Sequence, residues 1–154
     1  MKKIKLTKGF EALIDNKDFY ILNKYQWSVR KNGNGVYAYT IVDKKHIGMH
    51  TIILPTLKCV DHKDGNGLNN QRENLREASV KDNIRNSKIS RNNTSSYKGV
   101  SYHANNKTKP HRAYITCNRK RIHLGYFSDI KDAAIAYNEA AVKYFGEFAR
   151  LNIV

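Results

Sequence analysis

The spacing of apolar residues along the chain predicts short strands in its first third. Val36–Val42 is rich in β-branched and aromatic residues and follows a strong turn signal at Asn32–Gly35. Asp18–Trp27 carries apolar residues at helical spacing, which predicts a short helix between strands. No catalytic constellation occurs in residues 1–48. We therefore expect this β-rich lead-in to cover the core of the segment that follows.

Residues 49–90 predict the order strand, loop, helix. After an apolar run at Met49–Leu57, the segment Cys59–Gly67 predicts a strand that runs into a glycine-rich turn. Ser79 stands where it can cap a helix whose apolar residues, Val80 and Ile84, repeat at helical spacing.

The last part of the chain predicts a sheet covered by one helix. Residues 91–96 have the polar composition of a linker. Apolar residues in Asp129–Phe145 recur at i, i+3, i+4 and i+7, with Ser128 expected to cap this helix and Gly146 to end it. Between linker and helix stand three β-like runs: Tyr97–His103, Arg112–Asn118 and Arg121–Phe127.

Alternation along these strands indicates which side chains face away from the helix. Ala113, Ile115 and Cys117 are expected to face the helix, so their neighbours face outward. Lys98 joins the outward set only if Gly99 forms a bulge. Such a sheet face fits a DNA major groove, with an ordinary solvated face as the alternative. The outward set is Ser101, His103, Arg112, Tyr114, Thr116, Arg121 and His123.

The net charge favours a nucleic-acid partner. The 154 residues include 28 Lys and Arg against 13 Asp and Glu, which gives a formal charge of +15. Residues 83–128 contain no acid, but they contain ten of the basic residues together with interleaved tyrosines. A solvated basic face is the alternative reading of such a run.

Other classes of protein are excluded by composition. The first residues lack the apolar core of a secretory signal, and no apolar run approaches the roughly 20 residues of a membrane span. Two cysteines, Cys59 and Cys117, are too few for a disulfide framework and lack the spacing of a zinc site. We expect a cytoplasmic protein with no membrane partner and no small-molecule cofactor.

Four residues of the middle segment could carry chemistry together. Asp61 and the amide of Asn83 offer oxygen ligands to a hard cation such as Mg²⁺. A neutral His62 could deprotonate an attacking water, and Asn74 follows it by twelve residues. Taken singly, each has an ordinary explanation as part of a turn or cap. Combined, they indicate metal-assisted hydrolysis of a phosphodiester.

Two known families resemble this chain. Residues 49–86, with Met49 to Thr51, the run Val60–Gly67, and Asn83 and Asn86, resemble the HNH motif of phage and bacterial homing endonucleases. Residues 97–152 resemble the ERF-type, APETALA-like DNA-binding domain. The segment 6–15 is similar to the lead-in of endonucleases that join these two modules, so the resemblance covers nearly the whole chain.

The resemblance implies an α+β fold with a defined division of labour. A lead-in at 1–48 precedes a ββα-metal HNH module at 49–90, a linker at 91–96, and an ERF-type domain at 97–154 whose three-stranded antiparallel sheet packs on one helix. The products would be a 5′-phosphate and a 3′-hydroxyl, with Mg²⁺ as cofactor and Mn²⁺ as a substitute. The host would be a bacterial or phage-infected cell.

Specific residues acquire roles from the resemblance. Asp61 and Asn83 match the metal ligands, His62 the general base, and Asn74 the residue that braces the loop. Asn83 replaces a histidine found in many HNH enzymes. Because Thr51 replaces the arginine that often follows His50, no catalytic role is assigned to His50. The implied DNA contacts are Lys98, Ser101, His103, Tyr114, Thr116, Arg121 and His123, with Arg112 and Lys109 suited to the DNA backbone.

The preferred hypothesis is a site-specific, magnesium-dependent endonuclease of the homing type that acts on double-stranded DNA. A DNA-binding regulator with a structural HNH module is the alternative, and a structured-RNA binder of ribosomal type is a third. The sequence leaves the oligomeric state open, and it does not distinguish nicking from double-strand cleavage.

Overall fold

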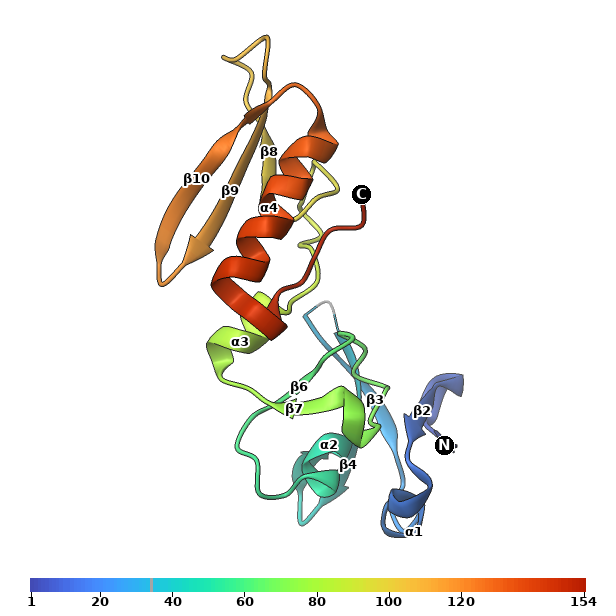
Figure 1. The fold of residues 1–154 in the computed structure, drawn as a ribbon. Coiled ribbons are helices and arrows are strands. Elements are labelled where there is room, and N and C mark those ends of the chain that lie inside the picture. Colours follow the sequence, from blue (N-terminus) through green and yellow to red (C-terminus); the bar gives the residue numbers. More distant parts are fainter. Residues whose placement is uncertain (34) are drawn as a thin grey trace. The chain divides into compact units, whose positions relative to one another are not determined.

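The computed structural model of the chain describes residues 1–33 and 35–154 (Figure 1). The chain packs into two compact units, residues 1–84 and 85–154, and each is described by itself. Several small antiparallel sheets with helices confirm the α+β class. The turn expected at Asn32–Gly35 includes position 34, which lies outside the described residues.

The first unit opens with a two-stranded and a three-stranded antiparallel sheet. In the two-stranded sheet β1 (Lys2–Lys5) pairs with β2 (Glu11–Ile14). The three-stranded sheet has the order β3 (Ser28–Asn32), β4 (Gly35–Val42) and β5 (Lys45–Gly48). Short helical segments connect or follow these strands: η1 (Thr7–Gly9), η2 (Asn16–Asp18), α1 (Phe19–Leu22) and α2 (Met49–Ile53).

The core of this unit gathers side chains from nearly all of these elements. Ile14, Leu22 and Met49 are fully buried within it. Trp27 joins the same cluster, and its indole N–H donates to the Leu22 carbonyl at 2.8 Å, so its one polar group is satisfied. The helix predicted within Asp18–Trp27 is confined to the single turn of α1 and the 3-10 turn before it.

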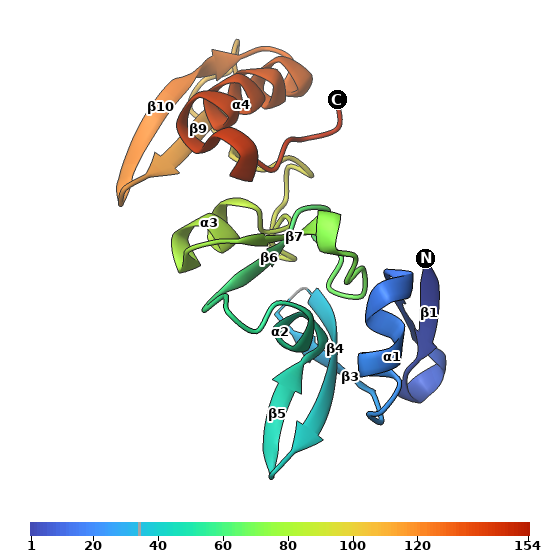
Figure 2. The same ribbon diagram turned by 60° about the horizontal axis from the view of Figure 1, so that its bottom comes forward.

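A second hairpin and a helix complete the first unit. β6 (Val60–His62) pairs antiparallel with β7 (Leu75–Glu77), which follows the turn η3 (Arg72–Asn74), and α3 (Val80–Arg85) comes next (Figure 2). Ser79 caps α3 as predicted, because its Oγ accepts from the Asp82 backbone N–H at 3.2 Å. Val80 and Ile84 are 70% and 65% exposed, so the spacing that indicated this helix does not mark a buried face.

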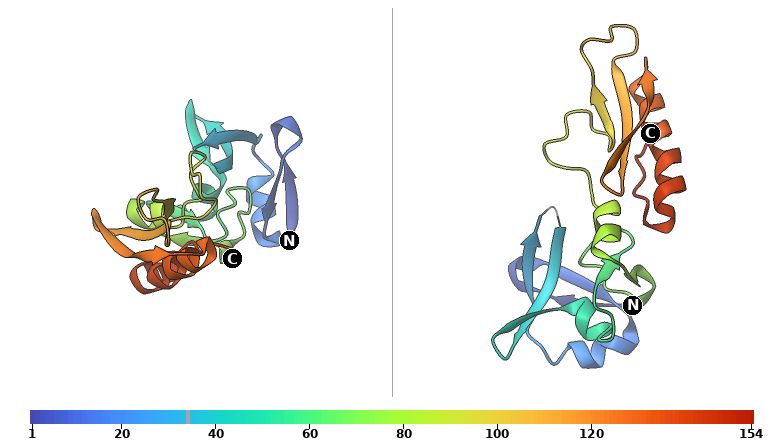
Figure 3. Two further views of the ribbon diagram at one scale, coloured as in Figure 1. Left: turned by 90° about the horizontal axis from the view of Figure 1, so that it is seen from above. Right: turned by 90° about the vertical axis from the view of Figure 1, so that its left-hand side faces the viewer.

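The second unit is a three-stranded antiparallel sheet with a long helix on one face (Figure 3), as predicted. Its strand order is β10 (Lys120–Phe127), β9 (His111–Cys117), β8 (Val100–Tyr102). The helix α4 (Ile130–Phe145) ends in the turn η4 (Gly146–Phe148). Ala133, Ala134 and Ala141 are fully buried, since small side chains let α4 approach the sheet closely.

The ends of α4 correct one prediction and confirm another. Its cap is Asp129, whose carboxylate accepts from the Lys131 backbone N–H at 2.7 Å, and not the preceding Ser128. Gly146 ends the helix with a φ of 54°. Across the described residues, we find no helix that combines the length and the apolar character needed to cross a membrane.

Asn152 fastens the last residues of the chain onto the second unit. Its side chain exchanges two hydrogen bonds with the backbone of Lys98, at 2.7 and 3.1 Å. Its backbone exchanges two more with the side chain of Asn138 on α4, at 2.7 and 3.0 Å. Residues 91–96 form neither helix nor strand and belong to this unit, and the functional domain boundaries stay predictions.

Candidate active site

The β6–β7 hairpin sets the position of two predicted site residues. Its register places Asp61 opposite Arg76 and His62 opposite Leu75. Backbone hydrogen bonds extend the ladder on both sides, from Ala78 N–H to the Cys59 carbonyl at 3.1 Å and from Lys63 N–H to the Asn74 carbonyl at 2.9 Å. Both residues therefore stand on a hydrogen-bonded backbone.

Arg76, on the neighbouring strand, forms an ion pair with the carboxylate of Asp61. Its Nε and Nη2 both donate to Asp61 Oδ2, at 2.9 and 2.7 Å. The Arg76 and Asp61 side chains are only 10% and 8% exposed, so the charged pair is largely removed from water. No role for Arg76 is predicted from the sequence. The strand register would have revealed it, because an antiparallel pair places these two side chains on one face.

His62 is buried among three other polar or aromatic residues. Its Nε2 lies 3.3 Å from the Oδ1 of Asn70, and the rings of Tyr37 and His50 meet its ring edge-on at centroid distances of 5.8 and 5.4 Å. Burial lowers the pKa of His62 below its usual 6.5, although the bond to Asn70 and nearby carboxylates oppose the shift. A neutral imidazole, which a general base requires, is therefore favoured.

His50 on α2 was given no catalytic role from the sequence, yet it lies against His62. Burial, followed by the influence of His62, lowers the pKa of His50 to about 4. Its Nδ1 is buried and has no hydrogen-bond partner among residues 1–33 and 35–154. Residues far apart in sequence meet here, so no local motif could have indicated the contact.

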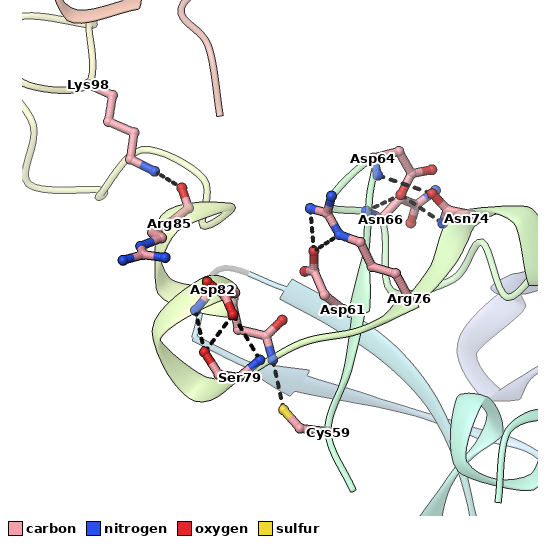
Figure 4. A network of polar contacts seen from close by, with 11 residues as sticks. Cys59, Asp61, Asp64, Asn66, Asn74, Arg76, Ser79, Asp82, Arg85 and Lys98 are labelled. Atoms are coloured by element: carbon pink, nitrogen blue, oxygen red, sulfur yellow. Dashed lines mark hydrogen bonds and ion pairs between the residues drawn. The ribbon is translucent and has the colours of Figure 1, made fainter. Parts of the chain in front are cut away.

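Asn74 spans the loop that joins the two strands of the hairpin. Its Oδ1 accepts from the Asp64 backbone N–H at 3.1 Å, and its Nδ2 donates to Asp64 Oδ1 at 3.0 Å (Figure 4). The same Nδ2 also donates to the Asn69 carbonyl at 2.7 Å. Burial alone would raise the pKa of Asp64, but its hydrogen bonds with Asn66, Asn69 and Asn74 outweigh that effect and lower it. These contacts suit the bracing role predicted for Asn74. That role does not require Asn74 to contact His62 directly.

Asn83 reaches the same hairpin from α3. Its Nδ2 donates to the sulfur of Cys59 at 3.1 Å. Because Cys59 and Asp61 are two residues apart on an extended segment, their side chains share a face, and Asn83 contacts that face. The amide nitrogen is engaged by sulfur, so Oδ1 is the atom of Asn83 that suits a cation.

The donor set fits a hard divalent cation. A carboxylate and an amide oxygen are ligands that Mg²⁺ accepts, with water and substrate phosphate completing the shell. Within residues 1–33 and 35–154 there is no cluster of three or more His, Cys, Asp or Glu residues able to hold a metal. A softer metal that needs several nitrogen or sulfur ligands is less well matched.

The second unit brings most of the predicted DNA contacts onto one sheet. The β9–β10 register pairs Thr116 with Arg121 and Tyr114 with His123, and the β8–β9 register pairs Ser101 with Arg112. The guanidinium of Arg121 lies 4.6 Å from the Tyr114 ring centroid, and that of Arg112 lies 5.6 Å from it. None of these residues is buried.

Tyr126 links His103 to this group, although the sequence did not select it. The ring of Tyr126 lies 5.3 Å from the ring of His103 and 4.7 Å from that of His123. Strand alternation could have indicated the position only if the register shift between His123 and Gly125 had been foreseen.

Lys98 is not brought together with the other predicted contacts. Its Nζ donates to the carbonyls of Arg85 and Ser87, at 2.6 and 2.8 Å. Burial, followed by the nearby Arg150 cation, lowers the pKa of Lys98 to about 8. Lys98 precedes the paired part of β8, and the Gly99 that follows it has a φ of 75° and accepts from Tyr114 N–H through its carbonyl at 2.8 Å.

Comparison with known proteins gives one informative relative. No known family model matches the chain, and no solved structure matches it. An uncharacterized HNH endonuclease of Acanthamoeba polyphaga mimivirus is 32% identical over 149 residues, which is 94% of this chain and 76% of the relative. The similarity thus spans both units, including the hairpin that holds Asp61 and His62. The chain belongs to the HNH endonuclease family.

Proposed function

We propose that this chain is a site-specific DNA endonuclease of the homing type that requires Mg²⁺, with Mn²⁺ as a substitute. The observation that carries the proposal is a buried, neutral His62 next to Asp61 on a hairpin that also contacts Asn83. Family membership makes DNA the expected substrate. The products are a 5′-phosphate and a 3′-hydroxyl.

Each residue of the site has a distinct task in this mechanism. Asp61 and Asn83 hold the cation, which when bound stabilises the charge that develops on the phosphate and on the departing 3′-oxygen. His62 takes a proton from the attacking water, since its burial keeps it neutral near pH 7. Asn74 fixes the loop after His62, and Arg76 fixes the carboxylate of Asp61.

The second unit is proposed to read the DNA as an ERF-type domain. Ser101 and Arg112 are neighbours on adjacent strands, and within the described part of the chain the buried Ser101 Oγ and Arg112 Nε have no hydrogen-bond partner. Unsatisfied polar atoms of this kind cost about 1–3 kcal/mol each, but they are buried and do not themselves meet a ligand. An accessible cation on the same sheet face is the guanidinium of Arg121, 4.6 Å from the Tyr114 ring centroid, and it suits a partner with anionic or polar groups. DNA phosphates or base edges, approached from the same side as Arg121, supply such groups.

Replacing His62 tests the catalytic assignment. His62→Ala should lower the cleavage rate by about 10²–10⁴-fold, because proton transfer by a positioned base contributes that much. Cleavage is measured by digesting a genomic library with Mg²⁺ and sequencing the ends on both strands, and DNA affinity is measured separately. His46→Ala is the matched control, because His46 is an exposed histidine of the same unit. Undiminished cleavage by His62→Ala would refute the mechanism.

One observation favours a second function. Arg76 already satisfies Asp61 with two hydrogen bonds, so the hairpin is stabilised by contacts that need no metal, as a purely structural module would require. A DNA-binding regulator of this kind would bind DNA in a salt-sensitive way and leave both strands intact in Mg²⁺ and in Mn²⁺. The same library digestion separates the two functions.

A further inference from the structure

Asn70 is a fully buried amide whose surroundings leave it a single orientation. Its backbone N–H donates to the Leu13 carbonyl at 2.8 Å, which fastens it to β2. Its Nδ2 lies 3.3 Å from the Gly67 carbonyl, and its Oδ1 lies 3.3 Å from His62 Nε2. Both ends of the side-chain amide therefore have a specific neighbour.

The chemistry of these neighbours decides which ring nitrogen of His62 is protonated. A backbone carbonyl can only accept a hydrogen bond, so the NH₂ group of Asn70 must face Gly67. That orientation turns Oδ1 toward His62. Because Oδ1 can also only accept, the hydrogen bond forms only when His62 Nε2 carries the proton. A neutral imidazole has one N–H, so the lone pair is then on Nδ1.

Packing around the ring reinforces this arrangement. Tyr37 and His50 meet the His62 ring edge-on, at interplanar angles of 64° and 89°, and so restrict its rotation. Asn74, which the resemblance predicts to brace the loop, binds Asp64 and Asn69. The loop and the ring are thus held by two different asparagines.

We infer that Asn70 is a positioning residue that holds His62 in the Nε2–H tautomer and makes Nδ1 the atom that accepts the proton from water. The tautomer follows from the contacts of Asn70, while its use in proton transfer rests on the proposed nuclease function. We therefore expect the neutral imidazole of His62 to populate one tautomer, whereas an unconstrained histidine populates a mixture of two.

Long-range ¹H–¹⁵N NMR of the full chain tests the tautomer directly. The metal-free, DNA-free protein is measured at pH 7.5, where burial keeps His62 neutral. We expect the Nδ1 signal of His62 at the position of an unprotonated nitrogen and the Nε2 signal at that of a protonated one. A protonated Nδ1 in the unmutated protein would overturn the inference, and this result needs no variant that might misfold.

A pair of neighbouring variants separates positioning from general support of the loop. Asn70→Leu removes the acceptor and should move the His62 signals toward a mixture of tautomers, with a loss of kcat of about 10–100-fold at little changed KM. Asn69→Leu, one position away, removes a side-chain bond to Asp64 and should leave the His62 tautomer unchanged. Asn70→Asp keeps an acceptor and should keep the Nε2–H tautomer.

The outcomes distinguish failure of this inference from failure of the nuclease function. A fixed Nε2–H tautomer in a protein that never cuts DNA would retain the positioning role and refute the enzyme. An active enzyme whose His62 tautomer is the same in the unmutated protein and in Asn70→Leu would refute the positioning role alone.

Discussion

In the first unit the predicted base and metal ligands lie among their own hydrogen-bond partners, whereas in the second unit most of the predicted DNA contacts, Lys98 excepted, lie on a sheet face that solvent reaches. Asp61, His62 and Asn74 are buried, but Thr116, Arg121 and His123 are exposed. Proton transfer requires fixed distances, which burial and hydrogen bonds supply. Recognition of a groove requires accessible donors, which a sheet face supplies.

Two arginines show the same contrast between buried and exposed positions. Arg76 is enclosed with Asp61 in the first unit, while Arg121 stands exposed over the Tyr114 ring in the second. The same residue type therefore stabilises the fold in one unit and remains available to a ligand in the other.

The largest expected effect comes from exchanging these arginines for leucine. Arg76→Leu should lower the free energy of unfolding by about 3–5 kcal/mol, because the buried carboxylate of Asp61 loses its ion pair with Arg76. Arg121→Leu should cost about 1 kcal/mol or less, since only a cation–π contact is lost, yet it should weaken DNA binding and reduce its salt dependence. Urea unfolding is followed by fluorescence of Trp27, the single tryptophan, which reports the first unit. Equal destabilisation by both variants would contradict the comparison.

A glycine pair tests the second unit with a somewhat smaller expected effect. Gly99 has a φ of 75°, and a Cβ there would meet the Tyr137 ring and lie 2.6 Å from the Tyr114 carbonyl. Gly99→Ala should cost about 2–5 kcal/mol, the sum of left-handed strain and overpacking. Gly146→Ala should cost only about 1–3 kcal/mol, the strain of a φ of 54° with a ψ of −129°, because beyond its own chain neighbours no atom of the described residues lies within 4 Å of its Cβ position.

Circular dichroism, to which the long helix α4 contributes strongly, follows the unfolding of both glycine variants. The Trp27 fluorescence transition should stay where it is in the unmutated chain. A shift of that transition as large as the shift in the helical signal would show that the two units do not respond separately.

Acidification should lower the free energy of unfolding of the first unit more than that of the second. The share due to His50 is at most about 3 kcal/mol, because each unit of pKa shift corresponds to about 1.36 kcal/mol. Burial and the adjacent His62 lower the pKa of His50 from 6.5 to about 4. Between pH 6.5 and 4, His50 therefore binds a proton in the unfolded chain but not in the folded chain. The contribution of His50 to the free energy of unfolding is fully present above pH 6.5 and is lost as the pH falls toward 4.

His50→Gln should remove this share of the pH dependence, measured as urea unfolding by Trp27 fluorescence between pH 7.5 and 4. In the second unit, burial shifts the pKa of Lys98 to about 8 and, with Tyr114 contributing, that of Tyr137 to about 12. Both values lie outside the acidic window. A pH profile unchanged by His50→Gln would mean that His50 is protonated in the folded protein.

The sheet and helix of the second unit could be predicted from sequence because local periodicity specifies them. Alternation placed Ala113 and Ile115 toward α4, where both are buried. The error in the helix cap, Ser128 instead of Asp129, arose because both residues can cap and they stand side by side.

The first unit could be predicted only in part. Asp61 and His62 were recognised from their motif, but their supports come from other segments through tertiary contacts. Arg76 depends on the register of a three-residue strand, and His50 arrives from a short helix twelve residues earlier in the chain. Asn70 depends on a backbone bond to β2. Propensity and periodicity contain no information on such contacts.

The attachment of Asn152 to Lys98 and Asn138 has a consequence for the order of folding during synthesis. Every residue of the first unit has been translated once residue 84 is added, whereas Lys98, just before β8, gains its hydrogen bonds with Asn152 only when residue 152 emerges from the ribosome. Domains generally fold as units in the order of their synthesis. We therefore expect the hairpin that bears His62 to be formed while the sheet of the second unit is still incomplete.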